Sequence, residues 1–229
     1  MNGICFFGDA LARGVIFDSV RNRYTILKEN FVNLFSESTE TQIINHSRFG
    51  ATVTQGLAQF EKNQIDAEDA EVIVFEFGGN DCDFDWNAVS ETPNAVHLPK
   101  TEYPSFISTY KALIGKAKSL GKKIFILNLP PVDYNKYFSF ISNRRSTENI
   151  LKWLGGTSDF IYRWHERYNN AVSYIATVAK VPLIDIRSAF LEKRDYSDYL
   201  CNDGIHPNAK GHRLIADVLL DYRSGKTLA

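Results

Sequence analysis

A histidine and an aspartate stand three residues apart near the end of the chain, in the segment Asp203-Gly204-Ile205-His206-Pro207. At this spacing the Asp203 carboxylate can fold back onto one ring nitrogen of His206 and leave the other nitrogen free as a base. A second interpretation is a cap on the following helix beside a solvent-exposed histidine, and Pro207 near the helix start fits both. The segment therefore indicates either an oriented general base or a helix start.

Two other segments place polar groups directly after apolar runs. In Phe7-Gly8-Asp9-Ala10-Leu11, a Gly-Asp turn presents Ala10, which has no chemical handle. In Phe77-Gly78-Gly79-Asn80-Asp81, the glycines allow a sharp turn, after which the Asn80 amide is a potential hydrogen-bond donor. Taken alone, the first segment is a turn and the second fits an Asx turn at a strand end.

The elements that must position these segments alternate along the chain. Five short apolar runs, at residues 3–7, 42–45, 72–77, 123–129 and 182–186, are typical of buried parallel strands. Helices are expected at 26–35, at 106–120 before Gly121, and at about 209–222. This alternation predicts an α/β fold of three layers, with a five-stranded parallel sheet between helices. Sites in such sheets form outside the carboxyl ends of the strands, where all three segments would meet.

Composition narrows the class of protein. The 229 residues fit one domain, 1–229, and a net charge of -1 makes nucleic acid a poor partner. No apolar run is long enough for a transmembrane helix, and the start of the chain does not read as a signal peptide, so we expect a cytoplasmic protein. The three widely spaced cysteines, Cys5, Cys82 and Cys201, suggest neither a disulfide framework nor a zinc site.

An aromatic-rich stretch at about 130–168 is too long for a simple crossover. We expect helical insertions that cap one end of the sheet, and they form either a substrate wall or additional core. The acidic and aromatic loop from Asp81 to Trp86 is expected at the edge of the same crevice. We expect the substrate-binding residues to be Asp9, Asp81, Trp86 and Ile205.

Together the three segments resemble the SGNH, or GDSL, hydrolase superfamily, from residue 6 to about 220. The family's first block reads Gly-Asp-Ser, with the serine as nucleophile, whereas this chain has Ala10 at that position. The resemblance makes His206 the base and Asp203 its orienting partner. It assigns the oxyanion hole to the backbone N–H groups of residue 10 and Gly50 and to the Asn80 amide. It also implies a flavodoxin-like sheet and no metal or organic cofactor.

The resemblance implies a serine carboxylic-ester hydrolase. The aromatic insertion and the acidic loop suggest ring stacking and recognition of hydroxyl groups, so we expect removal of a small acyl group, acetyl, from a carbohydrate or other polyol. The resemblance also allows lysophospholipase, thioesterase or aryl-ester activity. With Ala10 at the nucleophile position, the chain is either an engineered Ser→Ala variant, which we favour, or a natural pseudoenzyme that binds acylated ligands without turnover. A nucleotide binder is disfavoured because no glycine-rich phosphate loop is present. The sequence does not indicate an oligomeric state.

Overall fold

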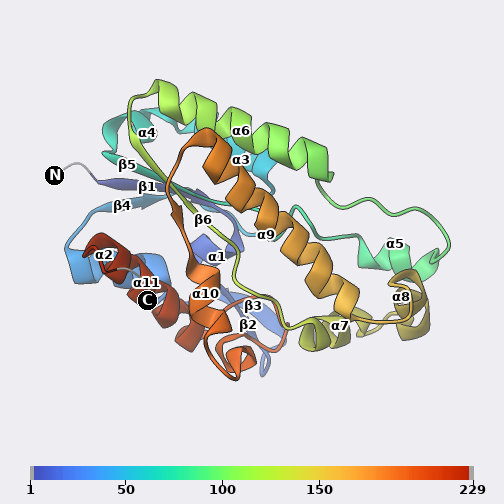
Figure 1. Ribbon diagram of the computed structural model, residues 1–229. Coiled ribbons are helices and arrows are strands. Elements are labelled where there is room, and N and C mark those ends of the chain that lie inside the picture. Colours follow the sequence, from blue (N-terminus) through green and yellow to red (C-terminus); the bar gives the residue numbers. More distant parts are fainter. Residues whose placement is uncertain (1–2, 227–229) are drawn as a thin grey trace.

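The computed structural model describes residues 3–226 and is built around a parallel sheet (Figure 1). Its five strands lie in the order β4-β1-β5-β6-β7, which places the first strand of the chain near the middle. All neighbouring pairs run parallel, so the carboxyl ends of the strands share one edge. The predicted α/β sheet is confirmed, with strands β1 (Ile4–Gly8), β4 (Ile43–Asn45), β5 (Val72–Glu76), β6 (Lys123–Leu127) and β7 (Leu183–Ile184).

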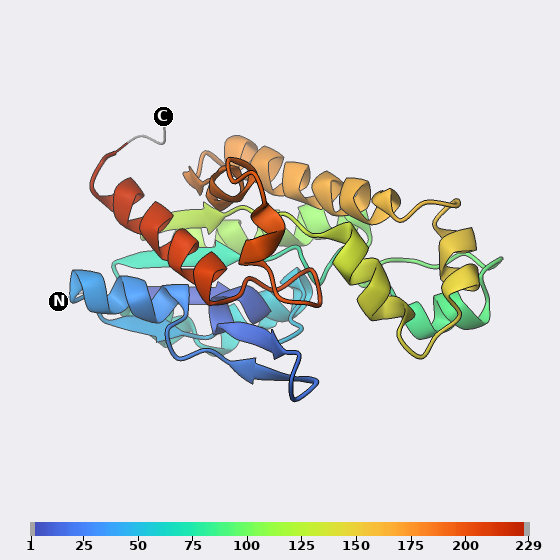
Figure 2. The same ribbon diagram turned by 90° about the horizontal axis from the view of Figure 1, so that it is seen from below.

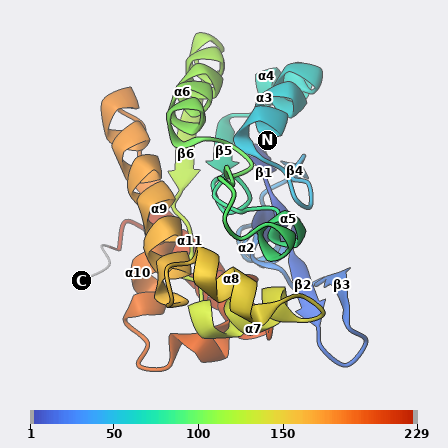
Figure 3. The ribbon, with the colours of Figure 1, turned by 90° about the vertical axis from the view of Figure 1, so that its right-hand side faces the viewer.

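Helices cover both faces of this sheet, as the end-on view in Figure 3 shows. One face is covered by α3 (Val53–Lys62), α6 (Tyr103–Ser119) and α9 (Asp159–Ala179), with α4 (Gln64–Asp69) beside them. The other face carries α1 (Ala10–Arg13), α2 (Phe31–Thr39), α10 (Ile186–Leu191) and α11 (Ala209–Arg223). A separate hydrophobic core lies on each face, because strands buried on both sides present apolar side chains alternately to each layer.

Three short helices, α5 (Trp86–Glu91), α7 (Tyr134–Ser142) and α8 (Thr147–Trp153), lie away from the sheet at one end of the molecule (Figure 2). They share a third apolar cluster that includes Phe84, Trp86 and Leu154. The expected helical insertion at 130–168 therefore has two parts, the outer helices α7 and α8 and the first turns of α9. Helices α7 and α8 build the outer cluster, whereas residues 159–168 begin α9, whose later turns pack on the sheet. None of the helices within residues 3–226 is long and apolar enough to cross a membrane.

The helix expected at 26–35 is wrong over its first residues. Ile26 ends a β-hairpin of β2 (Val15–Asp18) and β3 (Arg23–Ile26), in which it pairs with Val15. The helix begins only at Phe31, because the Asn30 side chain caps it by accepting hydrogen bonds from two backbone N–H groups. Ile26 and Leu27 were apolar at helical spacing, but strand pairing and the asparagine cap set the actual boundary.

The last strand also ends earlier than the run 182–186 predicts. Asp185 caps α10 by accepting from the backbone N–H of Ser188, so Ile186 is already helical. The next residue, Arg187, is buried and ties the layers together. Its guanidinium donates to the Leu129 carbonyl oxygen at 3.2 Å and lies 2.5 Å from a carboxylate oxygen of Glu166 on α9. These contacts fix the segment after β6, which forms part of the site described next.

Candidate active site

Loops from three distant parts of the chain meet at one cavity of about 110 Å³. Ala10 follows β1, Asn80 follows β5, and His206 lies in the loop before α11; all three line this cavity. Ala10 and Asn80 meet because β1 and β5, the strands that precede them, are hydrogen-bonded neighbours in register from Ile4 and Val72 onward. The structure therefore places these three predicted site residues in one hollow at the carboxyl edge of the sheet.

Asp203 lies behind His206 as the sequence spacing suggests. Its Oδ2 is 2.6 Å from Nδ1 of His206, and the Asp203 side chain is fully buried. The other oxygen, Oδ1, accepts from the backbone N–H groups of Ile205 and His206, each at 3.2 Å. Because the ionised carboxylate only accepts, it holds the Nδ1–H tautomer and leaves Nε2 of His206 as the proton acceptor.

The loop that carries this pair is closed on itself. The N–H of Cys201 donates to the His206 carbonyl oxygen at 2.7 Å, and Leu200 forms an isolated bridge with Pro207. Gly204 has a φ of 77° and comes so close to Asp133 that a Cβ would lie 2.5 Å from its carbonyl oxygen. Only glycine fits both the backbone conformation and this approach, which sets the turn between Asp203 and His206.

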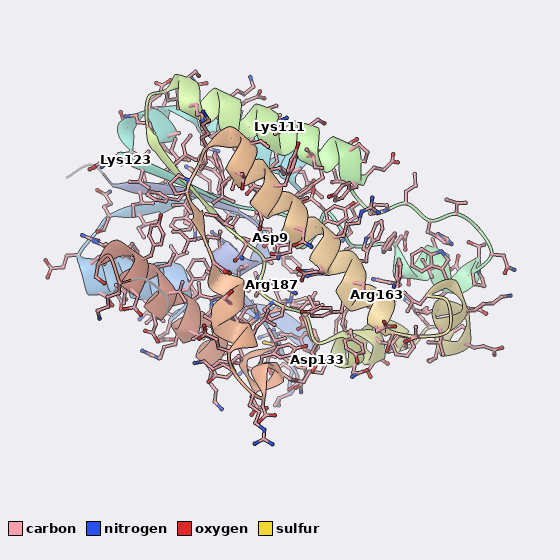
Figure 4. All side chains as sticks on the ribbon, viewed as in Figure 1. Asp9, Lys111, Lys123, Asp133, Arg163 and Arg187 are labelled. Atoms are coloured by element: carbon pink, nitrogen blue, oxygen red, sulfur yellow. The ribbon has the colours of Figure 1, made fainter. Side chains whose placement is uncertain are left out.

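Asp9 lines the cavity, and both of its carboxylate oxygens already accept hydrogen bonds within the protein. Its Oδ1 accepts from the N–H of Leu11 at 2.8 Å, which caps α1, and its Oδ2 accepts from Nδ2 of Asn80 at 2.7 Å. The side chain is 4 % exposed and lies in the middle of the view in Figure 4. Asp9 thus helps to hold Ala10 and Asn80 in place, and its contact with substrate stays a prediction.

Gly50 and Asp81 do not line the cavity. Gly50 has a φ of 74° and borders a separate surface hollow with Thr52 and Gln55. Asp81 is fully buried, and both its carboxylate oxygens accept from the N–H of Val53, the first residue of α3. Asp81 is therefore a structural anchor for α3, and the expectation that it contacts substrate is not met. The Asp81 carboxylate accepts from the first N–H of α3, a partner 28 residues earlier in the chain that could not be read from the sequence.

The cavity wall beyond Ala10 and His206 is mainly apolar. Both remaining predicted substrate residues, Trp86 and Ile205, line it. The indole N–H of Trp86 donates to Asp83 Oδ1 at 2.8 Å and also lies 3.0 Å from the Tyr137 hydroxyl, so it is already paired. Further lining residues come from the loop after β6 and from the α7–α9 region: Leu129, Pro130, Val132, Tyr137, Leu154, Phe160, Ile161 and Trp164.

Sequence reasoning missed the aromatic surroundings of His206. The Tyr24 ring on β3 lies 5.2 Å from the His206 ring, and the exposed Phe49 ring lies 4.9 Å from Tyr24. Tyr24 was missed because its hairpin had been assigned in part to a helix. Glu76, which also lines the cavity, was missed although a carboxylate at the end of a buried apolar run is itself a signal.

Comparison with known protein families identifies the family to which this chain belongs. Residues 6–214 match the model of the GDSL-like Lipase/Acylhydrolase family, which is most of the chain. The chain belongs to this family. The match spans all three segments that meet at the cavity.

Curated members of the GDSL family are distant in sequence. The chain is 27% identical over 175 residues to the isoamyl acetate-hydrolyzing esterase of Saccharomyces cerevisiae, covering 76% of this chain and 63% of that protein. It is 26% identical over 164 residues to the GDSL esterase/lipase CPRD49 of Arabidopsis thaliana, covering 69% of this chain and 57% of that protein. The chain thus spans less than two thirds of the length of these relatives.

Solved structures share the GDSL fold over nearly the whole chain. A lipase/acylhydrolase from Enterococcus faecalis superimposes with a TM-score of 0.71 at 17% identity, covering 99% of this chain and 97% of that one. A catalytic mutant of Axe2, an acetylxylan esterase from Geobacillus stearothermophilus, gives 0.65 at 19% identity, covering 96% and 94%. At these identities the likeness establishes the fold.

Cysteine does not replace the family's nucleophile here. Cys82 lines the cavity, but its Sγ donates to the Gly79 carbonyl oxygen at 3.2 Å, and burial raises the pKa of its thiol well above the usual range. Burial also raises the pKa of Cys201 to about 11. A thiol is a weak nucleophile unless it ionises, so both residues act as small buried side chains.

His165 on α9 is a second buried histidine in the cavity wall. Its Nδ1 is buried and has no hydrogen-bond partner within residues 3–226. Burial, and secondarily the Arg187 charge, lower its pKa from 6.5 to about 3. The folded protein therefore holds His165 neutral at neutral and mildly acidic pH.

This shift predicts a loss of stability in acid. Below about pH 6.5 the unfolded chain binds a proton at His165 that the folded chain does not, so stability falls as pH falls toward 3. Between about pH 7.5 and pH 5 this histidine should remove about 2 kcal/mol. Urea unfolding of the chain and of His165→Leu at both pH values measures it: the variant should lose less stability. Equal losses in the two proteins would contradict the prediction.

Proposed function

We propose that this chain binds carboxylic esters over Ala10, and that its site performs serine-type hydrolysis once residue 10 carries a hydroxyl. The observation that carries the proposal is the single cavity lined by Ala10, Asn80 and His206, with Asp203 2.6 Å behind the histidine. Membership of an esterase and lipase family supports the same class of reaction. With alanine at residue 10, the chain holds the ester without forming an acyl-enzyme.

In the mechanism we propose, each residue has one task. A hydroxyl on residue 10 attacks the ester carbonyl carbon, while Nε2 of His206 takes the hydroxyl proton and returns it to the leaving alcohol. Asp203 holds the imidazole tautomer. The oxyanion is stabilised by the Ala10 N–H, which has no intrahelical partner at the first position of α1, and by the Asn80 amide. Water then cleaves the acyl-enzyme by the same route.

The best substrates on this geometry are esters with a compact apolar group. The wall beyond Ala10 is made mainly of apolar and aromatic side chains, and the Trp86 N–H is already paired within the protein. A sugar placed there would leave hydroxyl groups without partners, which costs about 1–3 kcal/mol for each buried group. We propose Trp86 and Ile205 as walls around the apolar part of the ester. The yeast relative, named for isoamyl acetate, supports an ester with an apolar alcohol.

Removal of acetyl from a carbohydrate is the second candidate. Acetylxylan esterases are among the structural neighbours, and a cavity of about 110 Å³ also accepts an acetyl group. In that case the sugar would lie at the mouth, beside the exposed Phe49 and Tyr24, rather than inside the cavity. Partners other than a small-molecule ester are not proposed.

Binding to the chain itself separates these candidates, because Ala10 leaves the ester intact. Calorimetric titration with isoamyl acetate, phenyl acetate and a fully acetylated methyl xyloside should give the highest affinity for an apolar ester. Leu154→Phe, which fills the cavity, should weaken binding by about tenfold, whereas Leu191→Phe on the exposed side of α10 should not. Tighter binding of the acetylated xyloside would favour the second candidate, and no binding of any ester would overturn the proposal.

A further inference from the structure

Three residues connect the sheet to the cavity through hydrogen bonds: Glu76 at the end of β5, Asp9 directly after β1, and Asn80. Nδ2 of Asn80 donates to Asp9 Oδ2 at 2.7 Å, and the N–H of Asp9 donates to Glu76 Oε2 at 3.3 Å. Glu76 is 1 % exposed. A buried carboxyl group next to a second one is costly, so this arrangement requires an explanation.

Room for Glu76 is built into the neighbouring strand. Gly8 is the register partner of Glu76 in the sheet, and a Cβ on Gly8 would lie 3.1 Å from Glu76 Oε2. The glycine therefore lets the glutamate side chain lie against β1 and reach Asp9. The segments that carry Ala10 and Asn80 are thus connected at the cavity wall by Glu76, which belongs to neither segment.

Glu76 Oε2 lies 3.3 Å from the backbone nitrogen of Asp9, and two buried carboxyl groups on such close residues repel each other strongly if both are ionised. Asp9 accepts N–H bonds from Leu11 and Asn80, and such bonds favour its charged form. Burial, and then the Asp9 charge, raise the pKa of Glu76 well above its usual range. Of the two groups, Glu76 is therefore the one whose neutral form is favoured, and as a neutral acid it can donate its proton to the nearby Asp9 carboxylate.

The charge on Asp9 determines which side of the Asn80 amide faces it. A primary amide carries two N–H donors on one side and an acceptor oxygen on the other, and either side can be turned toward a neighbour. A carboxylate only accepts, so an ionised Asp9 selects the nitrogen side of Asn80. The remaining N–H is then available on the cavity side. A flipped amide would present its oxygen to the ester carbonyl oxygen, which is repulsive.

We propose that Glu76 is a positioning residue: as a neutral acid hydrogen-bonded to Asp9, it fixes the Asn80 amide with an N–H toward the ester carbonyl oxygen. The inference rests on the proposed ester-binding function. It adds a residue outside the base, its orienting partner and the oxyanion donors. A purely structural role, holding the turn after β1 through the Asp9 N–H, is the alternative that the experiment must separate.

The test uses the chain as it stands, because an uncleaved ester reports the polarisation of its carbonyl group. Isotope-edited infrared spectra of phenyl acetate labelled with carbon-13 at the carbonyl should show its stretch at lower wavenumber when bound than in water. Asn80→Ala and Glu76→Leu should lose most of this shift. Glu76→Gln should keep it, because the glutamine accepts from the Asp9 N–H and donates to the Asp9 carboxylate as the acid does.

Kinetics in the Ala10→Ser protein give a second readout. Glu76→Leu should lower kcat by at least about tenfold, toward the ~10²–10³-fold expected for losing an oxyanion donor, with KM nearly unchanged. Should Glu76→Leu not fold, the infrared spectrum of the unmodified chain still decides. It should contain a band of a protonated carboxyl group at neutral pH, and this band must disappear in Glu76→Gln. Absence of that band overturns the proposal.

The outcomes separate this inference from the proposed function. Two results would overturn the inference alone and make Glu76 structural. The carbonyl stretch of the bound ester would still be shifted in folded Glu76→Leu, and Glu76→Leu in the Ala10→Ser protein would leave kcat equal to that of Ala10→Ser. If Ala10→Ser shows no hydrolysis while the shift still depends on Glu76, the catalytic proposal fails and the positioning role stands. If no ester binds, the ester-binding function fails, and the inference that rests on it fails with it.

Discussion

Ala10→Ser is expected to raise the rate of ester hydrolysis by a factor on the order of 10⁴–10⁶ over the unmodified chain. The range follows from serine-type enzymes, where loss of the nucleophile costs up to about 10⁶ in kcat and leaves only residual catalysis from the oxyanion hole and binding. The remaining parts of the site are in place: Asp203 holds His206, and Asn80 lines the same cavity as residue 10. The hydroxyl is the one chemical group that the proposed mechanism lacks.

The measurement is initial rates on a panel from acetate esters to longer apolar acyl esters, for the chain and for Ala10→Ser. Two controls isolate the mechanism. Ala10→Gly changes the same position without adding a nucleophile and should show no gain. Ala10→Ser combined with His206→Ala should fall back to about the level of the unmodified chain, because the hydroxyl then has no base. A folded Ala10→Ser protein that is inactive on the whole panel would contradict the enzyme assignment.

The same comparison bears on why alanine stands at residue 10. An engineered Ser→Ala variant should regain full turnover, since every other group was shaped around a serine. A natural pseudoenzyme has had no reason to keep His206 and Asp203 in working geometry, yet the 2.6 Å contact between them is intact. We therefore expect the single substitution to be sufficient.

The sequence was informative where local chemistry and chain order decide the structure. Apolar runs bounded by turns located the strands, and parallel pairing then required Ala10 and Asn80 to share an edge. The spacing of Asp203 and His206 anticipated their contact because three residues and one glycine are enough for the carboxylate to fold back. These are short-range or topological constraints, which a single sequence expresses directly.

The sequence was misleading where the hydrogen-bond partner of a polar side chain lies far away along the chain. Asp81 reads as an exposed loop acid, but the N–H of Val53 at the start of α3 takes both its oxygens. Asp9 lines the cavity as expected, but the sequence did not reveal that its carboxylate also accepts hydrogen bonds from Leu11 and Asn80. Tyr24 was missed because its hairpin was not predicted: the only hairpin residue in the pattern was Ile26, which was assigned to the helix at 26–35 and instead pairs with Val15. Such partners are set by packing and leave no periodic signal.

Asp203→Asn in the Ala10→Ser protein is expected to lower kcat by about 10⁴-fold, the cost of the same exchange in a serine-type triad. The asparagine oxygen can still accept from the N–H groups of Ile205 and His206, so the loop should keep its shape. Its amide, however, donates to Nδ1 of His206, which moves the ring proton to Nε2. The nitrogen that must accept the nucleophile's proton is then already protonated, and the base is lost although the geometry remains.

Asp18→Asn is the matched control. Asp18 Oδ1 also accepts from two backbone N–H groups, those of Val20 and Arg21, but it faces no histidine and lies outside the cavity. It should change kcat by less than about twofold, because surface substitutions of this kind are usually worth within ±0.5 kcal/mol. Thermal unfolding should show Asp203→Asn folded. Retention of more than about a tenth of kcat would mean that His206 does not depend on Asp203 for its tautomer, and the triad mechanism would then be wrong for this chain.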